Sequence, residues 1–138
     1  MRLSPMSLAI TAGIAGCSDV GASAGQAGAA SAGGVAIRDA EGAPDGCSLT
    51  IRFGSYAMGI DRGAARRIEQ LLTSAPDIRS VTRHGWGREG EYTLCVTTAS
   101  ATDAAALLAA IRPLLPAAPR GPIEVALADG TKVSAPKR

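Results

Sequence analysis

Residues 49–53 have the sequence Leu-Thr-Ile-Arg-Phe, and this alternation of apolar and polar side chains predicts a strand with one buried face. Asp129-Gly130 is a strong signal for a two-residue hairpin turn further along the chain. Four other segments are expected to be strands: 78–84, 92–97, 123–127 and, as a short return strand after that turn, 132–134.

Two helices are expected between these strands. The first follows Asp61, a suitable N-cap, and Pro76 ends it. The second is capped by Ser100 or Thr102, and Pro113 ends or kinks it. Apolar residues at helical spacing predict the buried stripes: Ile60, Ala64, Ile68, Leu71, Leu72 and Ala75 in the first helix, and Ala105, Leu107, Leu108 and Ile111 in the second.

The resulting order, βαββαβ with a terminal hairpin, predicts an α+β fold over residues 47–136. It suits the ferredoxin-like sandwich, in which one antiparallel sheet has the spatial order 4-1-3-2 and two helices cover one face. Right-handed crossovers fix which ends of the strands meet, and in this fold the first and second strands run the same way. The loop after 49–53 and the loop between 78–84 and 92–97 should therefore meet at one edge of the sheet.

The N-terminus has the pattern of a secretory signal, because a mostly apolar run over 3–15 follows Arg2 and is too short to span a bilayer. Ile14-Ala15-Gly16-Cys17 resembles the lipobox of bacterial lipoproteins. The resemblance implies that residues 1–16 are removed and that Cys17 receives fatty acyl chains such as palmitate. Because Ser18, and not an acidic residue, follows the cysteine, the resemblance implies the outer membrane, facing the periplasm.

Residues 17–46 are expected to be a flexible tether that is dispensable for folding. Between 21 and 36 every residue except Gln26 and Val35 is Gly, Ala or Ser, so this stretch has few side chains to bury. Polar residues over 39–46 continue the tether.

Composition argues against several function classes. The 14 basic and 12 acidic residues give a net charge of +2, too balanced for a dedicated nucleic-acid binder, and they offer no electrostatic argument for an anionic membrane. His84 is the only histidine, so a metal site or catalytic triad has little to use. Ser55 lacks the nucleophile-elbow pattern, and the glycines at 85, 87 and 90 lie between strands, outside a nucleotide-binding context. We therefore expect no enzyme activity, cofactor or metal.

The two loops that should meet at the sheet edge form the candidate binding surface. Trp, Tyr and Arg are enriched at binding hot spots. The alternative is that these loops only make turns, with Trp86 folded back over the helix ends and Arg83 paired with Glu89 or Glu91. The candidate residues are Ser55, Tyr56 and Met58 in the first loop and Arg83, His84, Trp86 and Arg88 in the second.

Cys47 and Cys95 remain after lipidation, and an extracytoplasmic location permits a disulfide between them. Their strands should be neighbours, but the alternation places Cys47 on the face of Leu49 and Cys95 on the face opposite Leu94. A bulge at Cys47 would allow the bridge, and otherwise Cys95 is a small buried thiol and Cys47 is free.

Two functions remain open for the domain. The first is a non-catalytic envelope lipoprotein that binds another protein or a second copy of itself through the 54–59 and 83–90 loops. The second is a small-ligand or enzyme-accessory domain of the periplasm that receives an anionic group on Arg83 and Arg88.

Overall fold

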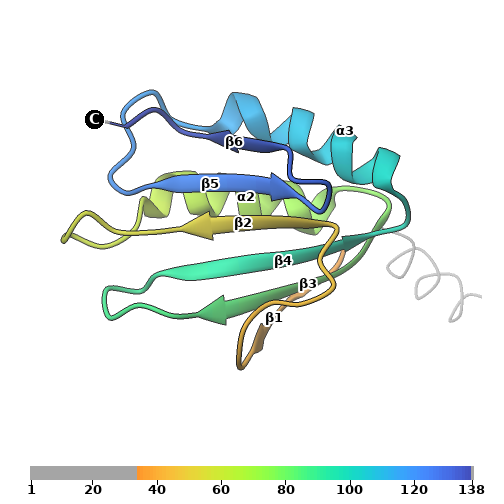
Figure 1. The fold of residues 1–138 in the computed structure, drawn as a ribbon, viewed down its shortest axis with the longest axis horizontal. Coiled ribbons are helices and arrows are strands. Elements are labelled where there is room, and N and C mark those ends of the chain that lie inside the picture. The colour runs from red at the N-terminus through yellow and green to blue at the C-terminus, as the bar shows by residue number, and fades with distance from the viewer. Residues whose placement is uncertain (1–33, 138) are drawn as a thin grey trace, which may run out of the picture. The chain divides into compact units, whose positions relative to one another are not determined.

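The computed structural model describes residues 34–137, which form a mixed α+β domain with one six-stranded sheet and two helices (Figure 1). The strand order is β1-β3-β4-β2-β5-β6. β1 pairs with β3 in parallel, and every other pair is antiparallel. The elements are β1 Ile37–Ala40, β2 Leu49–Phe53, α2 Arg62–Ser74, β3 Ile78–Gly85, β4 Tyr92–Thr98, α3 Ala101–Ile111, the 3-10 turn η1 Arg112–Leu114, β5 Ile123–Leu127 and β6 Lys132–Ser134.

Both helices begin at a side-chain cap that the sequence predicts. Asp61 Oδ1 accepts a hydrogen bond from the Ala64 N–H at 3.0 Å, and Ser100 Oγ accepts one from the Asp103 N–H at 3.1 Å. α2 ends two residues before Pro76, and α3 passes into η1 at Pro113. The buried stripe of α3 differs from the expectation at one position, because Ala104 is buried and Ala105 is exposed.

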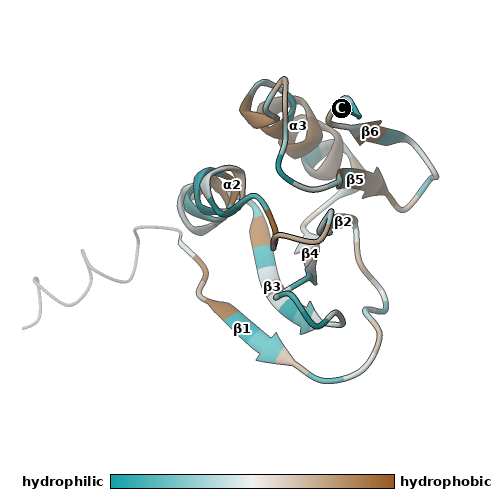
Figure 2. Ribbon diagram, turned by 90° about the vertical axis from the view of Figure 1, so that its left-hand side faces the viewer, coloured by the Kyte–Doolittle hydropathy of each residue, from teal (hydrophilic) through white to brown (hydrophobic). Residues whose placement is uncertain are grey.

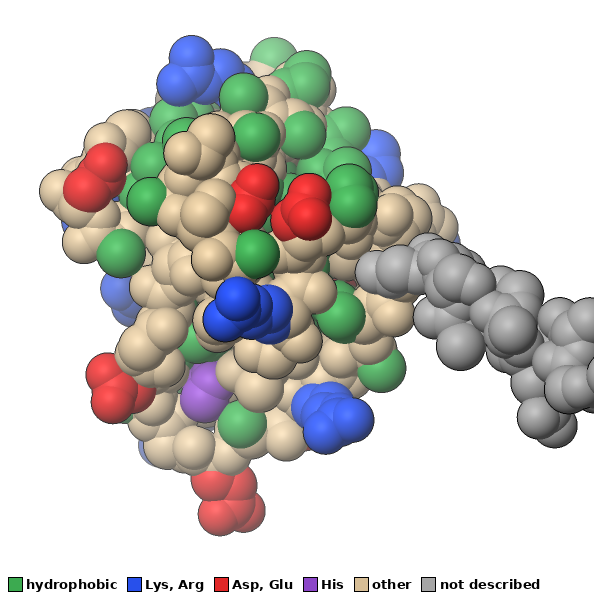
Figure 3. Space-filling view, turned by 90° about the vertical axis from the view of Figure 1, so that its right-hand side faces the viewer, with side chains coloured by type: hydrophobic (Ala, Val, Ile, Leu, Met, Phe, Trp, Pro, Cys, Tyr) green, Lys and Arg blue, Asp and Glu red, His purple; other side chains and the backbone are tan. Residues whose placement is uncertain are grey.

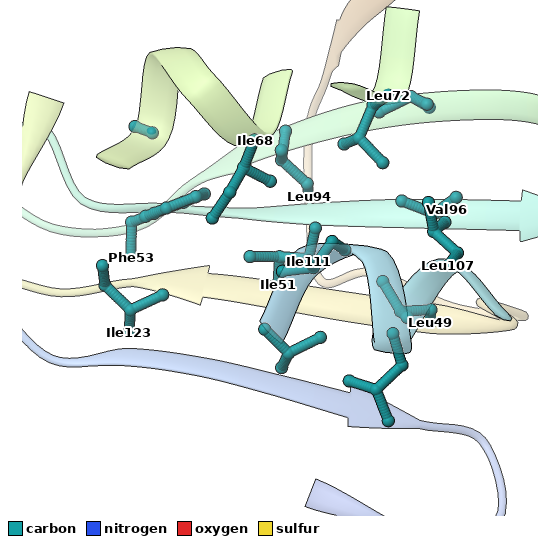
Figure 4. Close-up of a cluster of buried hydrophobic side chains, with 14 of the residues drawn as sticks. Leu49, Ile51, Phe53, Ile68, Leu72, Leu94, Val96, Leu107, Ile111 and Ile123 are labelled. Carbon is teal, nitrogen blue, oxygen red and sulfur yellow. The ribbon is translucent and has the colours of Figure 1, made fainter. Parts of the chain in front are cut away.

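Figure 2 shows both helices on one side of the sheet, where they enclose the hydrophobic core. Alternate residues of β2 and β4 face the helices, and register brings them side by side: Leu49 with Val96, Ile51 with Leu94, and Phe53 with Tyr92. The close-up in Figure 4 shows the aliphatic side chains of these pairs and Phe53 together with Ile68 and Leu72 of α2 and Leu107 and Ile111 of α3. The core is almost wholly aliphatic, as the composition requires.

Among the described residues, no helix covers the opposite face of the sheet. Thr50 and Arg52 of β2, Thr93 and Cys95 of β4, and His84 of β3 belong to it, because they alternate with the core residues. We call it the helix-free face.

The N-terminal boundary of the folded part is a correction. Residues 37–40 are expected to lie in the tether, but they form strand β1, with Ile37 opposite Val81 and Ala40 opposite His84. The edge of β3 offers unpaired backbone groups, which this short segment satisfies. A chain starting at Ala43 would therefore lack β1. The signal peptide, Cys17 and the Gly/Ala/Ser tether up to residue 33 lie outside the described residues.

Residues 41–48, which we call the crossing segment, are also part of the domain. β1 ends beside His84, whereas β2 begins beside Val96, so the connection between them crosses the helix-free face from one end of the sheet to the other.

Among residues 34–137, no helix has the length and apolar character that crossing a membrane requires.

Candidate functional site

The loops after β2 and between β3 and β4 are in contact, as the topology predicts. The Ser55 hydroxyl is hydrogen-bonded to the Glu89 carboxylate. The same Ser55 oxygen accepts hydrogen bonds from the N–H groups of Ala57 and Gly59, at 3.0 and 2.9 Å. Ser55 therefore holds its own loop in shape and ties that loop to the β3–β4 turn.

Trp86 lies over the helix-free face, at the end of the sheet where this turn is located. Its indole N–H donates a hydrogen bond to Thr93 Oγ1 at 3.1 Å, and the Arg52 guanidinium carbon lies 4.4 Å from its ring centroid. Trp86 is thus folded back over the sheet and not over the helix ends. Its side chain is held at two points, yet 47% of the residue remains exposed.

Two hollows lie on either side of Trp86, and Arg52 lines both. The first has a volume of about 410 Å³, between Trp86 and the crossing segment. The second is smaller, about 270 Å³, and has acidic walls. The other residues lining the first hollow are Gly42, Ala43, Pro44, His84, Gly85 and Thr93; those lining the second are Gly54, Ser55, Glu91, Pro122 and Glu124.

His84 is a structural residue of this face. Its Nδ1 lies 2.9 Å from the carbonyl oxygen of Gly42, and its Nε2 lies 3.0 Å from Thr82 Oγ1. A carbonyl can only accept, so Nδ1 carries the proton and Nε2 accepts from the threonine hydroxyl in the neutral ring. Both nitrogens are occupied and the residue is only 8% exposed, so His84 does not serve Ser55 as a base.

Arg83 does not belong to the loop surface. It faces the helix side of the sheet, where its guanidinium binds Glu69 of α2 at 2.6 Å and Asp39 of β1 at 3.5 Å. Its guanidinium carbon also lies 4.9 Å from the Tyr92 ring centroid. The alternative pairing with Glu89 or Glu91 is therefore wrong, and Arg83 joins a helix and two strands.

Tyr92 completes this cluster. Its hydroxyl donates to Glu69 Oε1 at 2.7 Å, on the same oxygen that Arg83 binds. Burial raises the pKa of the Tyr92 phenol, and the negative charge of Glu69 raises it further. Tyr92 is therefore a neutral hydrogen-bond donor at physiological pH.

Tyr56, Met58 and Arg88 point to other parts of the surface. Tyr56 and Met58 are 47% and 91% exposed and line a separate hollow with residues near the C-terminus. Arg88 is exposed on the β3–β4 turn. Of the seven candidate residues, only Ser55, His84 and Trp86 line the two hollows on the helix-free face, and Tyr56, Met58, Arg83 and Arg88 do not.

Cys47 and Cys95 form a disulfide, with their Cα atoms 5.3 Å apart. Cys95 faces the helix-free side, as the alternation in β4 requires. Cys47 lies in the crossing segment, two residues before β2 begins, so the alternation of β2 does not constrain it. The bridge therefore needs no bulge, and it fastens the crossing segment to the sheet.

Sequence reasoning missed Arg52, which contacts Trp86 and lines both hollows. Its signal was present, because Arg52 occupies a polar position in the alternation of residues 49–53. No pattern in the sequence indicates that residues 42–44 line the first hollow, since this depends on where the crossing segment passes.

No protein-family model matches the chain, and neither does any curated protein or solved structure.

Within the described part of the chain, no group of three or more His, Cys, Asp or Glu residues could hold a metal ion. On the face of the domain in Figure 3, side chains of both charge signs are spread among apolar and uncharged ones.

Proposed function

We propose that this chain is a lipid-anchored protein of the bacterial envelope, facing the periplasm from the outer membrane, whose domain binds another protein or a second copy of itself. The lipobox-like Ile14-Ala15-Gly16-Cys17 and the tether after it support the anchor. The Cys47–Cys95 disulfide supports export, since structural disulfides persist in oxidising compartments.

We also propose that β2, α2, β3, β4, α3 and β5 form a ferredoxin-like core, to which β1 and β6 are added at the two edges. The order β3-β4-β2-β5 within the sheet and the two helices on one face support it. That architecture serves many unrelated functions, so the function must be argued from the surface.

Trp86 is the observation on which the binding proposal depends. A half-exposed indole that is already held by Arg52 and Thr93 loses little side-chain freedom when a partner covers it. Tryptophan and arginine are the residue types most enriched where binding energy concentrates. The hollows on both sides of the ring would receive partner side chains.

A small anionic ligand is the second candidate. Among the described residues that line the 410 Å³ hollow, Arg52 is the only lysine, arginine or carboxylate side chain. That volume lies in the range of small-molecule sites. The 270 Å³ hollow, with Glu91 and Glu124, does not share this preference.

Metabolic labelling with a fatty acid tests the anchor. The wild-type chain should incorporate label, and Cys17→Ala should not, because the acylated thiol is gone. Cys47→Ser with Cys95→Ser is the matched control and should keep the label. Label retained on Cys17→Ala would show that the lipobox interpretation is wrong.

Affinity capture from envelope membranes tests the binding surface, with the wild-type chain, Trp86→Ala and Trp86→Phe as baits. Partner recovery should fall at least tenfold with Trp86→Ala, since truncating an anchor residue costs about 2 kcal/mol or more. Trp86→Phe should retain part of it. Ala128→Ser, on the distant β5–β6 turn, is the control. Equal recovery with Trp86→Ala at unchanged thermal stability would place the binding surface elsewhere.

A further inference from the structure

Three adjoining hollows occupy the end of the domain where the chain passes from β2 to α2. The largest, about 730 Å³, is lined by Tyr56, Met58, Pro119, Arg120 and Lys137. The second, about 330 Å³, shares Met58 and Arg120 with the first. The third, about 350 Å³, shares Ile60 and Arg62 with the second. The shared residues make these hollows one continuous surface.

Cations are concentrated on this surface. We call it the basic end and define it by Tyr56, Met58, Arg62, Arg66, Arg120 and Lys137. Within residues 34–137, no carboxylate lies within ion-pair distance of any of its four cations. Charges of both signs nearly cancel over the whole sequence, and folding brings Arg120 and Lys137 to the hollows that adjoin Arg62 and Arg66.

The two carboxylates that line the basic end already have partners. Asp61 accepts hydrogen bonds from the N–H groups of Ala64 and Arg120, at 3.0 and 3.2 Å. Burial raises the pKa of Asp61, but these two hydrogen bonds and the charge of Arg67 outweigh burial and lower it overall. Glu69 binds Arg83 and Tyr92. Neither carboxylate pairs with a cation of the basic end.

Exposed apolar side chains lie among these cations. Met58 is 91% exposed and Tyr56 is 47% exposed, and with Trp86 they are the large apolar side chains that the described residues expose. An apolar tip surrounded by arginine and lysine matches the boundary between lipid headgroups and acyl chains, where phosphates bind the cations. Tyrosine is favoured there because its ring is apolar and its hydroxyl is polar.

We infer that the basic end binds the surface of a membrane that contains anionic phospholipids. A flexible methionine and cations spread over three hollows suit a fluid surface, which offers phosphates at many positions, better than an acidic peptide with fixed side chains. The inference deepens the proposed function, since a lipid anchor would keep the domain near such a surface. Figure 1 shows the β2–α2 connection and the C-terminus on the same side of the domain, opposite the β5–β6 turn.

An environment-sensitive fluorophore on Met58→Cys tests this contact. The full chain also carries Cys17→Ala, so that the introduced cysteine is the only free thiol, and Ala128→Cys on the β5–β6 turn is the matched control site. Mixed phosphatidylglycerol and phosphatidylcholine vesicles should shift the emission of the probe at position 58 to the blue, but not at position 128. The apolar run at 3–15 remains in both variants and so affects both equally.

Charge neutralisation sharpens the test. Arg62→Gln with Arg120→Gln should weaken the affinity for vesicles, measured by titration with the probe at position 58, about 30-fold, given about 1 kcal/mol for each cation near an anionic surface. Arg38→Gln with Arg79→Gln removes two exposed cations elsewhere. It should leave the affinity for vesicles within about twofold of the value without these substitutions, because neither residue lines the three hollows.

Several outcomes would overturn the inference: equal shifts at positions 58 and 128, the same shift with phosphatidylcholine alone, or no loss after charge neutralisation. A shift produced by polyglutamate without vesicles would identify an acidic protein as the partner and would also overturn it. Since these chains lack Cys17, the result does not depend on acylation. Fatty-acid labelling can therefore fail while this test succeeds, and the reverse.

Discussion

The two faces of the sheet are buried in different ways, and β4 has buried side chains on both. Leu94 and Val96 are buried because two helices bring a layer of aliphatic side chains against them. Thr93 and Cys95, on the other face of the same strand, are also buried, but by Trp86, a disulfide and the crossing segment. The helix-covered face is stabilised by the non-directional burial of many apolar side chains. The helix-free face depends instead on a few directional interactions: the Trp86–Thr93 hydrogen bond, the Arg52–Trp86 contact and the disulfide. These leave an aromatic ring and two hollows at the surface.

The largest contrast is expected between neighbours in β2 that face opposite ways. Phe53 is fully buried and packs on Tyr92, with ring centroids 5.0 Å apart, so Phe53→Ala should lower the free energy of unfolding by about 3–5 kcal/mol. Arg52→Ala on the helix-free face should cost less than about 1 kcal/mol. Urea unfolding of both variants measures the difference. Similar losses would mean that the helix-free face contributes as much to stability as the core.

Removing the disulfide tests how far the helix-free face depends on its ties. Cys47 and Cys95 are 48 residues apart, so Cys47→Ser with Cys95→Ser should cost about 2–4 kcal/mol, chiefly through the greater freedom of the unfolded chain. Amide exchange should then rise in residues 41–48 more than in β2 and β4, because the crossing segment loses its fastening. Uniform acceleration across the sheet would contradict the distinction between the faces.

The Arg83–Glu69–Tyr92 cluster is a polar tie on the helix-covered side. Glu69→Gln should cost about 1.5–3 kcal/mol, because it leaves the partly buried Arg83 without its closest anion. Thermal unfolding measures the loss, and Gln70→Glu is a control that changes charge at the neighbouring exposed position. A loss as small as that of the control would make this pair equivalent to an ordinary surface ion pair.

Alkaline pH gives the smallest expected effect. The pKa of Tyr92 is raised by burial and by Glu69, so the folded chain keeps a proton that the unfolded chain releases above a pH of about 10. Stability should therefore be intact below that pH and fall above it, by about 1 kcal/mol per pH unit. Tyr92→Phe should remove most of this dependence. An unchanged slope in Tyr92→Phe would assign the dependence to other groups.

Local patterns predicted most of the elements. The alternation in 49–53 and 92–97, the caps at Asp61 and Ser100, and the turn at Asp129-Gly130 each involve residues within a few positions of one another. Such signals are present in the chain before it folds. The alternation also marks Arg52, but it does not identify Trp86 as its neighbour.

β1 shows where local patterns end. Residues 37–40 lack a turn signal before them and follow a Gly/Ala/Ser stretch, so nothing nearby indicates a strand. They form one because the edge of β3, more than 40 residues away in sequence, offers backbone partners. Arg83 is similar, since its partners Glu69 and Asp39 lie 14 and 44 positions before it.

The sequence by itself determined the chain's charge balance, its aliphatic core, its helices and most of its strands, because each follows from composition or from neighbouring residues. It also contains the lipobox-like motif on which the proposed anchor depends. Only the tertiary structure decided that Trp86 lies on Arg52, that Arg83 faces the helices, and that Arg120 and Lys137 line the same hollow as Met58. Those placements join segments from distant parts of the chain, and a chain whose charges nearly cancel overall can still concentrate one sign wherever folding brings its segments together.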